Sequence, residues 1–223
     1  VRLVGSEMCI RDRFTHYILQ EDEREIGIGS NNIKAVYVDE QKSLVYIGTH
    51  AGGLTVLHRN SGKMESFNQL NSQLVNENVY AILPDKGGNL LLGTLSALVS
   101  FNPEKKSFTT IDKEKDGTPF TSQRITILFR DSHKRLWVGG EEGISVFQQE
   151  GIEIEKVPIL PESSVTKTFT NCIYEAANGI IWVGTREGFY CFNEKEKKIK
   201  RYTTANGLPN NCLLYTSPSP RDG

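Results

Sequence analysis

The stretch IWVGTREGF, residues 181–189, has three counterparts earlier in the chain, and this repetition decides the fold. The central glycines of the four copies follow one another at intervals of 45, 46 and 45 residues. A fixed period in this range is typical of a repeat architecture. The three counterparts are VYIGTHAGGL at 45–54, LLLGTLSAL at 90–98 and LWVGGEEGI at 136–144.

A short run of β-branched, aromatic and aliphatic residues precedes each copy. Nearly continuous apolar runs of this length predict a strand that is buried on both faces. Three of the runs end in an aspartate, and these aspartates are 46 residues apart. The runs are IKAVYVD at 33–39, VYAILPD at 79–85, ITILFRD at 125–131 and CIYEA at 172–176.

Two further strands complete each repeat. A turn rich in Asp, Asn, Gly and Lys joins the first run to the glycine motif, as a tight hairpin requires. A third strand, such as LTVLH at 54–58, follows the second glycine or small residue of the motif. The fourth strand, such as KIKRYT at 198–203, alternates apolar and charged residues, so one of its faces or edges meets water.

Four antiparallel strands per period predict an all-β fold, a β-propeller fragment of about four four-stranded antiparallel blades. Trp137 and Trp182 would fill the interfaces between blades in this fold. The motif glycines would lie where the backbone approaches a neighbouring blade closely, and these are Gly48, Gly93, Gly139 and Gly184. We expect the blades to occupy residues 32–77, 78–123, 124–170 and 171–205.

The two ends of the chain depart from the repeat. Residues 1–13 and 212–223 look like translations of a sequencing-library adapter, and prolines 218 and 220 fall where the repeat requires a buried strand. We interpret both ends as adapter-like artefacts. Residues 14–31 would then be the outer strand of a preceding blade with a linker, and residues 206–211 the start of the next blade, so that the chain is a fragment.

The composition, with 38% hydrophobic and 24% charged residues, is that of an ordinary soluble globular domain. The 26 basic and 27 acidic residues nearly cancel, so there is no overall basic field to attract nucleic acid or anionic lipid. No apolar run is long enough to span a bilayer, and we expect no membrane contact by this part of the chain.

Motifs that would indicate catalysis are missing from the sequence. It contains no HExxH, CxxC, phosphate-binding Gly-Lys-Ser/Thr or GxSxG pattern. Cys172 and Cys191 fall on strands that are not adjacent within a blade, so we expect two buried free thiols. Because these motifs are missing, we expect no enzyme activity and no cofactor. We also expect no metal site, because the four histidines occupy different positions of the repeat. They are His16, His50, His58 and His133.

The repeat resembles that of the two-component regulator propeller family. Residues 122–144, SQRITILFRDSHKRLWVGGEEGI, and 171–189, NCIYEAANGIIWVGTREGF, resemble it best, and NGLPNN at 206–211 looks like the lead-in to a further copy. Tyr46 and Leu91 replace the tryptophan in the looser first two copies. The resemblance implies a seven-bladed propeller in the periplasmic sensor of a Bacteroidetes-type hybrid histidine kinase, with a second propeller and kinase domains elsewhere in the full-length chain.

A ligand site is expected on the face where the turns from second to third strand meet the connections from fourth to first strand. Loops on a rigid scaffold are the usual place for recognition. His50, Ser96, Glu141 and Arg186 differ from one another at equivalent places of the repeat, which marks positions that the fold leaves free. The candidate binding residues are Asn32, His50, Asn78, Arg124, Glu141, Asn171 and Arg186.

Two classes of function remain open on this basis. The first is a signal-transducing sensor module that binds an oligosaccharide or another small solute. The resemblance implies this function, because members of that family commonly respond to glycan breakdown products. The alternative is a non-catalytic protein-interaction platform without a small ligand.

Overall fold

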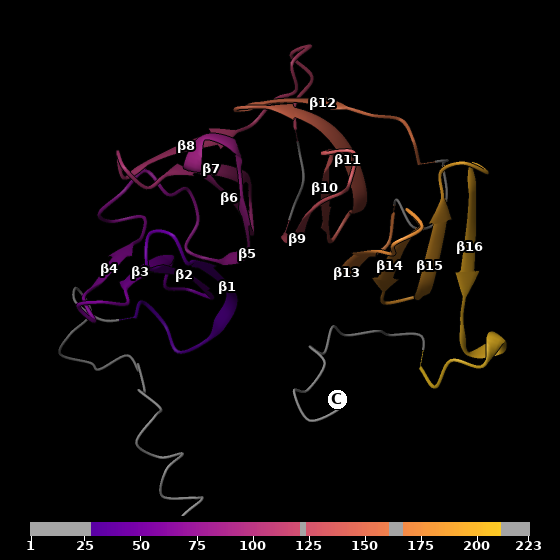
Figure 1. Ribbon diagram of the computed structural model, residues 1–223, viewed down its shortest axis with the longest axis horizontal. Coiled ribbons are helices and arrows are strands. Elements are labelled where there is room, and N and C mark those ends of the chain that lie inside the picture. Colours follow the sequence, from indigo (N-terminus) through magenta and orange to yellow (C-terminus); the bar gives the residue numbers. More distant parts are fainter. Residues whose placement is uncertain (1–27, 121–123, 161–166, 211–223) are drawn as a thin grey trace, which may run out of the picture.

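The computed structural model describes residues 28–120, 124–160 and 167–210, which form four four-stranded antiparallel sheets arranged as an arc (Figure 1). This confirms the predicted all-β propeller fragment. The sheets take their strands in chain order. Their strands are β1 (Ile33–Asp39), β2 (Leu44–Thr49), β3 (Leu54–His58) and β4 (Met64–Phe67); β5 (Val79–Pro84), β6 (Leu90–Thr94), β7 (Leu98–Asn102) and β8 (Ser107–Ile111); β9 (Ile125–Arg130), β10 (Leu136–Gly140), β11 (Gly143–Glu150) and β12 (Glu153–Lys156); and β13 (Thr170–Glu175), β14 (Ile181–Thr185), β15 (Gly188–Asn193) and β16 (Lys198–Tyr202).

The 3₁₀ turn η1 (Lys86–Gly88) lies between β5 and β6, and a second 3₁₀ turn, η3 (Thr204–Asn206), follows β16. Within the described ranges, no helix is long and apolar enough to cross a membrane. Residues 14–27 of the predicted outer strand and linker lie outside the described residues, as do the two tails at 1–13 and 212–223.

The glycine motif lies at the contact between neighbouring sheets. A Cβ on Gly93 would come within 2.7 Å of the Ile125 side chain, which belongs to the first strand of the next sheet. A Cβ on Gly139 would come within 2.9 Å of Thr170 at the start of β13. The motif keeps its glycine because the inner strand of the following blade occupies the space that a side chain would need.

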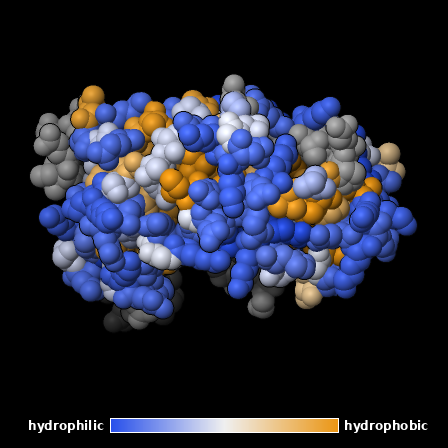
Figure 2. All heavy atoms as spheres, turned by 90° about the horizontal axis from the view of Figure 1, so that it is seen from above, coloured by the Kyte–Doolittle hydropathy of each residue, from blue (hydrophilic) through white to orange (hydrophobic). Residues whose placement is uncertain are grey.

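Three hydrophobic clusters fill the three junctions between sheets. Tyr46 and Phe101 lie in the first cluster, Leu136 and Phe147 in the second, and Trp137 in the third. The surface seen from the side of β8 and β12 is largely hydrophilic, with patches of hydrophobic residues between the hydrophilic ones (Figure 2).

The innermost strands are less buried than the sequence predicts. Val36 on β1 is 58% exposed and Val38 is 40% exposed, so the prediction of a strand buried on both faces is wrong for β1. The strands β1, β5, β9 and β13 lie along the inner side of the arc, where no further layer covers them within the described residues (Figure 1). Some apolar side chains of these strands pack against neighbouring sheets, and others are exposed to solvent.

The two tryptophans have different environments, although they occupy the same repeat position. Trp137 is fully buried at the junction between the third and fourth sheets. Trp182 is only half-buried and stacks on Phe189 of its own sheet, with ring centroids 5.0 Å apart. Trp182 lies on the last described sheet, so it does not fill an interface between described blades as the sequence analysis expected.

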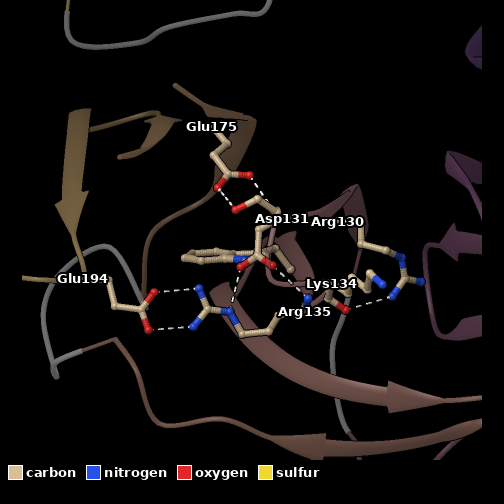
Figure 3. Close-up of polar contacts among 8 residues, drawn as sticks. Arg130, Asp131, Lys134, Arg135, Glu175 and Glu194 are labelled. Atoms are coloured by element: carbon tan, nitrogen blue, oxygen red, sulfur yellow. Dashed lines mark hydrogen bonds and ion pairs between the residues drawn. The ribbon is translucent and has the colours of Figure 1, made fainter. Parts of the chain in front are cut away.

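A polar cluster joins the third and fourth sheets beside Trp137 (Figure 3). Asp131, whose side chain is 0% exposed, accepts hydrogen bonds from Arg135 Nε at 2.7 Å and from the Trp137 indole at 2.8 Å. The Arg135 guanidinium also binds both carboxylate oxygens of Glu194, each at 2.7 Å. These bonds, of which the one to Glu194 contributes most, raise the pKa of Arg135, so the guanidinium stays charged despite its burial.

Candidate ligand site at the channel mouth

An open pocket of about 430 Å³ lies at one end of the inner strands, and all four sheets contribute lining residues to it. It lies where the starts of the inner strands meet the turn after β2, which is the face predicted from the sequence. We call this end of the inner strands the channel mouth. Pockets of this size accommodate small solutes. Its lining residues are Asn32, Lys34, His50, Tyr80, Arg124, Thr126, Phe169 and Asn171.

A β-bulge at the second residue of each inner strand shapes this pocket. In β1 the pairing with β2 shifts between Ile33 and Ala35, and in β5 the pairing with β6 shifts between Val79 and Ala81. The same irregularity recurs at the starts of β9 and β13. The four residues at these bulges all line the pocket, and they are Lys34, Tyr80, Thr126 and Asn171. A bulge leaves one residue unpaired and changes the direction of its side chain, which explains how polar groups from strands reach the site.

Backbone hydrogen bonds fix the loops around the pocket. The amide of His50 donates to the Asn32 carbonyl at 2.8 Å, and the amide of Arg186 donates to the Phe169 carbonyl at 3.2 Å. In the second sheet Leu95 makes the equivalent bond, to Asn78. Leu95, rather than Ser96, is therefore the structural counterpart of His50 and Arg186, which corrects the alignment drawn from the sequence.

Threonines at the ends of β2, β6 and β14 hold the neighbouring turns. The Thr94 hydroxyl donates to the Ala97 carbonyl at 2.8 Å, and the Thr185 hydroxyl donates to the Gly188 carbonyl at 2.8 Å. Thr49 makes the same contact with Gly53 at 3.1 Å. These side chains are buried, so the threonine of the Gly-Thr motif stabilises the turn and does not face a ligand.

Four of the seven residues singled out from the sequence line the pocket, namely Asn32, His50, Arg124 and Asn171. The other three lie next to lining residues without lining the pocket themselves. Asn78 accepts a hydrogen bond from the amide of Ala51, the residue after His50. Glu141 lies 3.9 Å from Arg124 Nε, and the Arg186 guanidinium lies 4.0 Å from the centre of the Phe169 ring.

The pocket has four further lining residues that were not predicted from the sequence, namely Lys34, Tyr80, Thr126 and Phe169. The first three are bulge residues, which differ among the repeats while the residues on either side stay mostly apolar. That contrast is a usable signal, but the apolar residues around each of these positions predict a buried strand.

Arg124 is one of the two cationic residues that line the pocket. Its backbone has a φ of 45°, in the left-handed region that side-chain-bearing residues rarely adopt, and its amide donates to Leu95. Its guanidinium carbon lies 6.0 Å from the centre of the Tyr80 ring. The Tyr80 hydroxyl is in turn 3.4 Å from His50 Nδ1.

The remaining polar candidates are dispersed over the described residues. His58 ends β3 and His133 lies in the turn before β10, and no group of three potential metal ligands occurs within the described ranges. Cys172 and Cys191 are free thiols, but both are only half-buried, which corrects the expectation of full burial. Burial raises the pKa of each thiol.

The family model described as the two component regulator propeller matches residues 163–187. This range includes the fourth inner strand and the glycine motif of β14. The chain carries a two-component regulator propeller repeat.

The proteins similar to this chain are longer than the part that it matches. Histidine kinase P4 of Formosa agariphila is 29% identical over 157 residues, which cover 65% of this chain and 11% of the kinase. The extracellular domain of a B. thetaiotaomicron protein assigned to the hybrid two component systems has a TM-score of 0.69 at 24% identity. That match covers 90% of this chain and 26% of the solved one.

A second extracellular domain from B. thetaiotaomicron, assigned to the one component systems, has a TM-score of 0.66 at 19% identity. It covers 82% of this chain and 24% of the solved one. These solved structures share the fold of this chain, and this chain spans only a small part of the proteins that it matches.

Proposed function

We propose that this chain is the solute-sensing propeller part of a two-component regulatory system, located in the periplasm or outside the cell. The observation that supports the proposal most is the pocket at the channel mouth, because all four sheets contribute side chains to it. A solute in this pocket touches several blades at once. Its binding free energy therefore depends on how the blades are placed relative to one another, and a sensor needs such a dependence.

The lining residues suit a glycan-derived solute. Amide side chains of Asn32 and Asn171 offer hydrogen-bond donors and acceptors, and Tyr80 and Phe169 offer aromatic surface. Pockets for small polar ligands usually combine apolar or aromatic walls with a few oriented polar groups. The similarity to a histidine kinase over 65% of this chain supports a role in signalling, and in this proposal kinase domains belong to the rest of a longer protein. In this proposal the propeller itself is non-catalytic.

Titration calorimetry of the full chain against a panel of neutral and acidic oligosaccharides tests the proposal. His50→Ala should weaken binding, because His50 lines the pocket and meets the Tyr80 hydroxyl. His58→Ala is the matched control, because His58 is exposed at the end of β3 and does not line the pocket.

Binding that is unaffected by His50→Ala would remove the solute site from the channel mouth. If none of the oligosaccharides binds, the alternative function, a protein-interaction platform, is favoured.

A further inference from the structure

The charged residues of the channel-mouth pocket are all cationic. Lys34 on β1 and Arg124 before β9 are the charged members of its lining, and no lining residue is acidic. This contrasts with the chain as a whole, whose formal net charge is −1. The two cations come from the first and third sheets, so they are brought together only by the curvature of the arc.

The Arg124 guanidinium is partly buried but has no close ion-pair partner among the described residues. Its Nε atom is buried and has no hydrogen-bond partner. The nearest carboxylate oxygen, from Glu141, lies 3.9 Å away, which is beyond hydrogen-bond distance. Guanidinium groups bind carboxylates and sulfate-like oxyanions through short charge-assisted bonds, so this arrangement leaves an anion-binding capacity unused.

Arg135 is an arginine of the same fold whose guanidinium nitrogens do bind carboxylates closely. It binds Asp131 and both oxygens of Glu194 at 2.7 Å (Figure 3). The scaffold can therefore hold an arginine in tight ion pairs where the structure needs one. At the channel mouth it instead holds Arg124 in a left-handed backbone conformation, beside an aromatic ring, with a distant carboxylate.

We propose that the solute recognised at the channel mouth is a sugar bearing an anionic group, a carboxylate or a sulfate, which Arg124 binds and Lys34 assists. This inference rests on the proposed function. The asparagines and aromatic rings contact the body of the sugar, whereas the two cations select its charge. Glu141 is the internal counterion of Arg124 and competes with the ligand anion for it.

The test compares two anionic sugars with an uncharged ester. Calorimetric titrations of the full chain use digalacturonate, its dimethyl ester and a sulfated neutral disaccharide. The acid or the sulfated sugar should bind at least about tenfold more tightly than the ester, because a charge-assisted hydrogen bond is lost with the charge. This preference should decline in high salt, which screens the partly exposed cations.

Variants of the full chain assign the preference to residues. Arg124→Gln should weaken binding of the anionic sugar about tenfold and change ester binding less than about twofold, and Lys34→Gln should have a smaller effect of the same sign. Glu141→Gln should strengthen anion binding about two- to threefold, since a competing carboxylate is removed. Lys105→Gln, in the exposed turn between β7 and β8, is the matched control and should change nothing.

The outcomes separate this inference from the proposed function. Equal binding of acid and ester, both weakened by His50→Ala, would overturn the anionic ligand and leave the sensor site standing. Selective anion binding that Arg124→Gln does not alter would overturn the role of Arg124. Failure of every sugar to bind would count against both proposals.

Discussion

The junction between the first and second sheets and the junction between the third and fourth sheets are built from different chemistry. The first is an aromatic junction, in which Phe101 lies 4.5 Å from Phe108 and 5.4 Å from Phe67 between ring centroids. The last is a clamped junction, in which the buried Trp137 donates a hydrogen bond to Asp131, and Arg135 forms ion pairs with Asp131 and with Glu194 after β15.

The difference shows that the repeat specifies where two sheets meet, but not which interactions stabilise their junction. Asp39 and Asp131 occupy the same repeat position, but Asp39 accepts from the amide of Lys42 in its own turn, whereas Asp131 binds Arg135 and Trp137. Ser132 then bonds Glu175 of the next sheet at 2.6 Å. The aromatic junction depends on apolar burial, and the clamped junction depends in addition on charge, so acid should affect them differently.

The largest expected effect is at the aromatic junction. Phe101→Ala should lower the free energy of unfolding by about 3–5 kcal/mol, because Phe101 is 1% exposed and its removal leaves a cavity among rings. Phe101→Leu, which keeps most of the volume, should cost less than about 2 kcal/mol. Urea unfolding measures both, and equal losses would contradict packing as the cause.

The next effect is at the clamped junction. Asp131→Ala should cost about 2–4 kcal/mol, because it leaves the buried Trp137 indole and the Arg135 Nε without their acceptor. Asp131→Asn keeps an acceptor and should cost less. A loss below about 0.5 kcal/mol for the alanine variant, again in urea, would show that the clamp is not part of the junction's stability.

Acid should weaken the clamped junction through Glu194. Its hydrogen bonds with Arg135 hold the pKa of Glu194 below its usual value. The stabilisation is therefore present above the unfolded-state pKa, which is about 4.3 for glutamate, and is lost as the pH falls through the folded-state pKa. Glu194→Gln should be less stable than the parent at pH 7, and the gap should close as the pH falls below about 4.

Urea unfolding of the parent and of Glu194→Gln across this pH range measures the gap. Phe101→Leu serves as the control, because its deficit has no titrating group and should stay constant with pH. A gap for Glu194→Gln that is independent of pH would show that charge does not hold this junction.

The smallest effect is expected at the one ion pair that crosses the aromatic junction in the described residues. Lys106 Nζ lies 2.7 Å from Glu65, but the lysine side chain is 56% exposed. Lys106→Gln should change stability by no more than about 0.5 kcal/mol, because water and salt screen the pair. A loss comparable to that of Asp131→Ala would mean that both junctions are clamped by charge.

The sequence predicted the blades because each strand type has its own residue pattern within a period of 45 to 46 residues. It also predicted which face holds the loops of the candidate site, since chain direction alternates from strand to strand. It could not separate Trp137 from Trp182, because the two residues share a motif and differ only in whether a neighbouring sheet covers them.

The candidate site shows the same division. Asn32, His50 and Arg124 were selected because they flank strands, but Lys34, Tyr80 and Thr126 were assigned to buried strands. Their exposure follows from bulges, which arise when the inner strand pairs with its neighbour and are invisible in the local pattern.

Sequence alone therefore determined the repeat, the four strands of each blade and the glycine at every blade contact, because these are set by local patterns that recur with a fixed spacing. The tertiary structure decided which side chains meet across blades, including the Arg135 clamp and the cationic channel mouth. These contacts join residues from different repeats, and their geometry depends on the curvature of the arc, which no single repeat encodes.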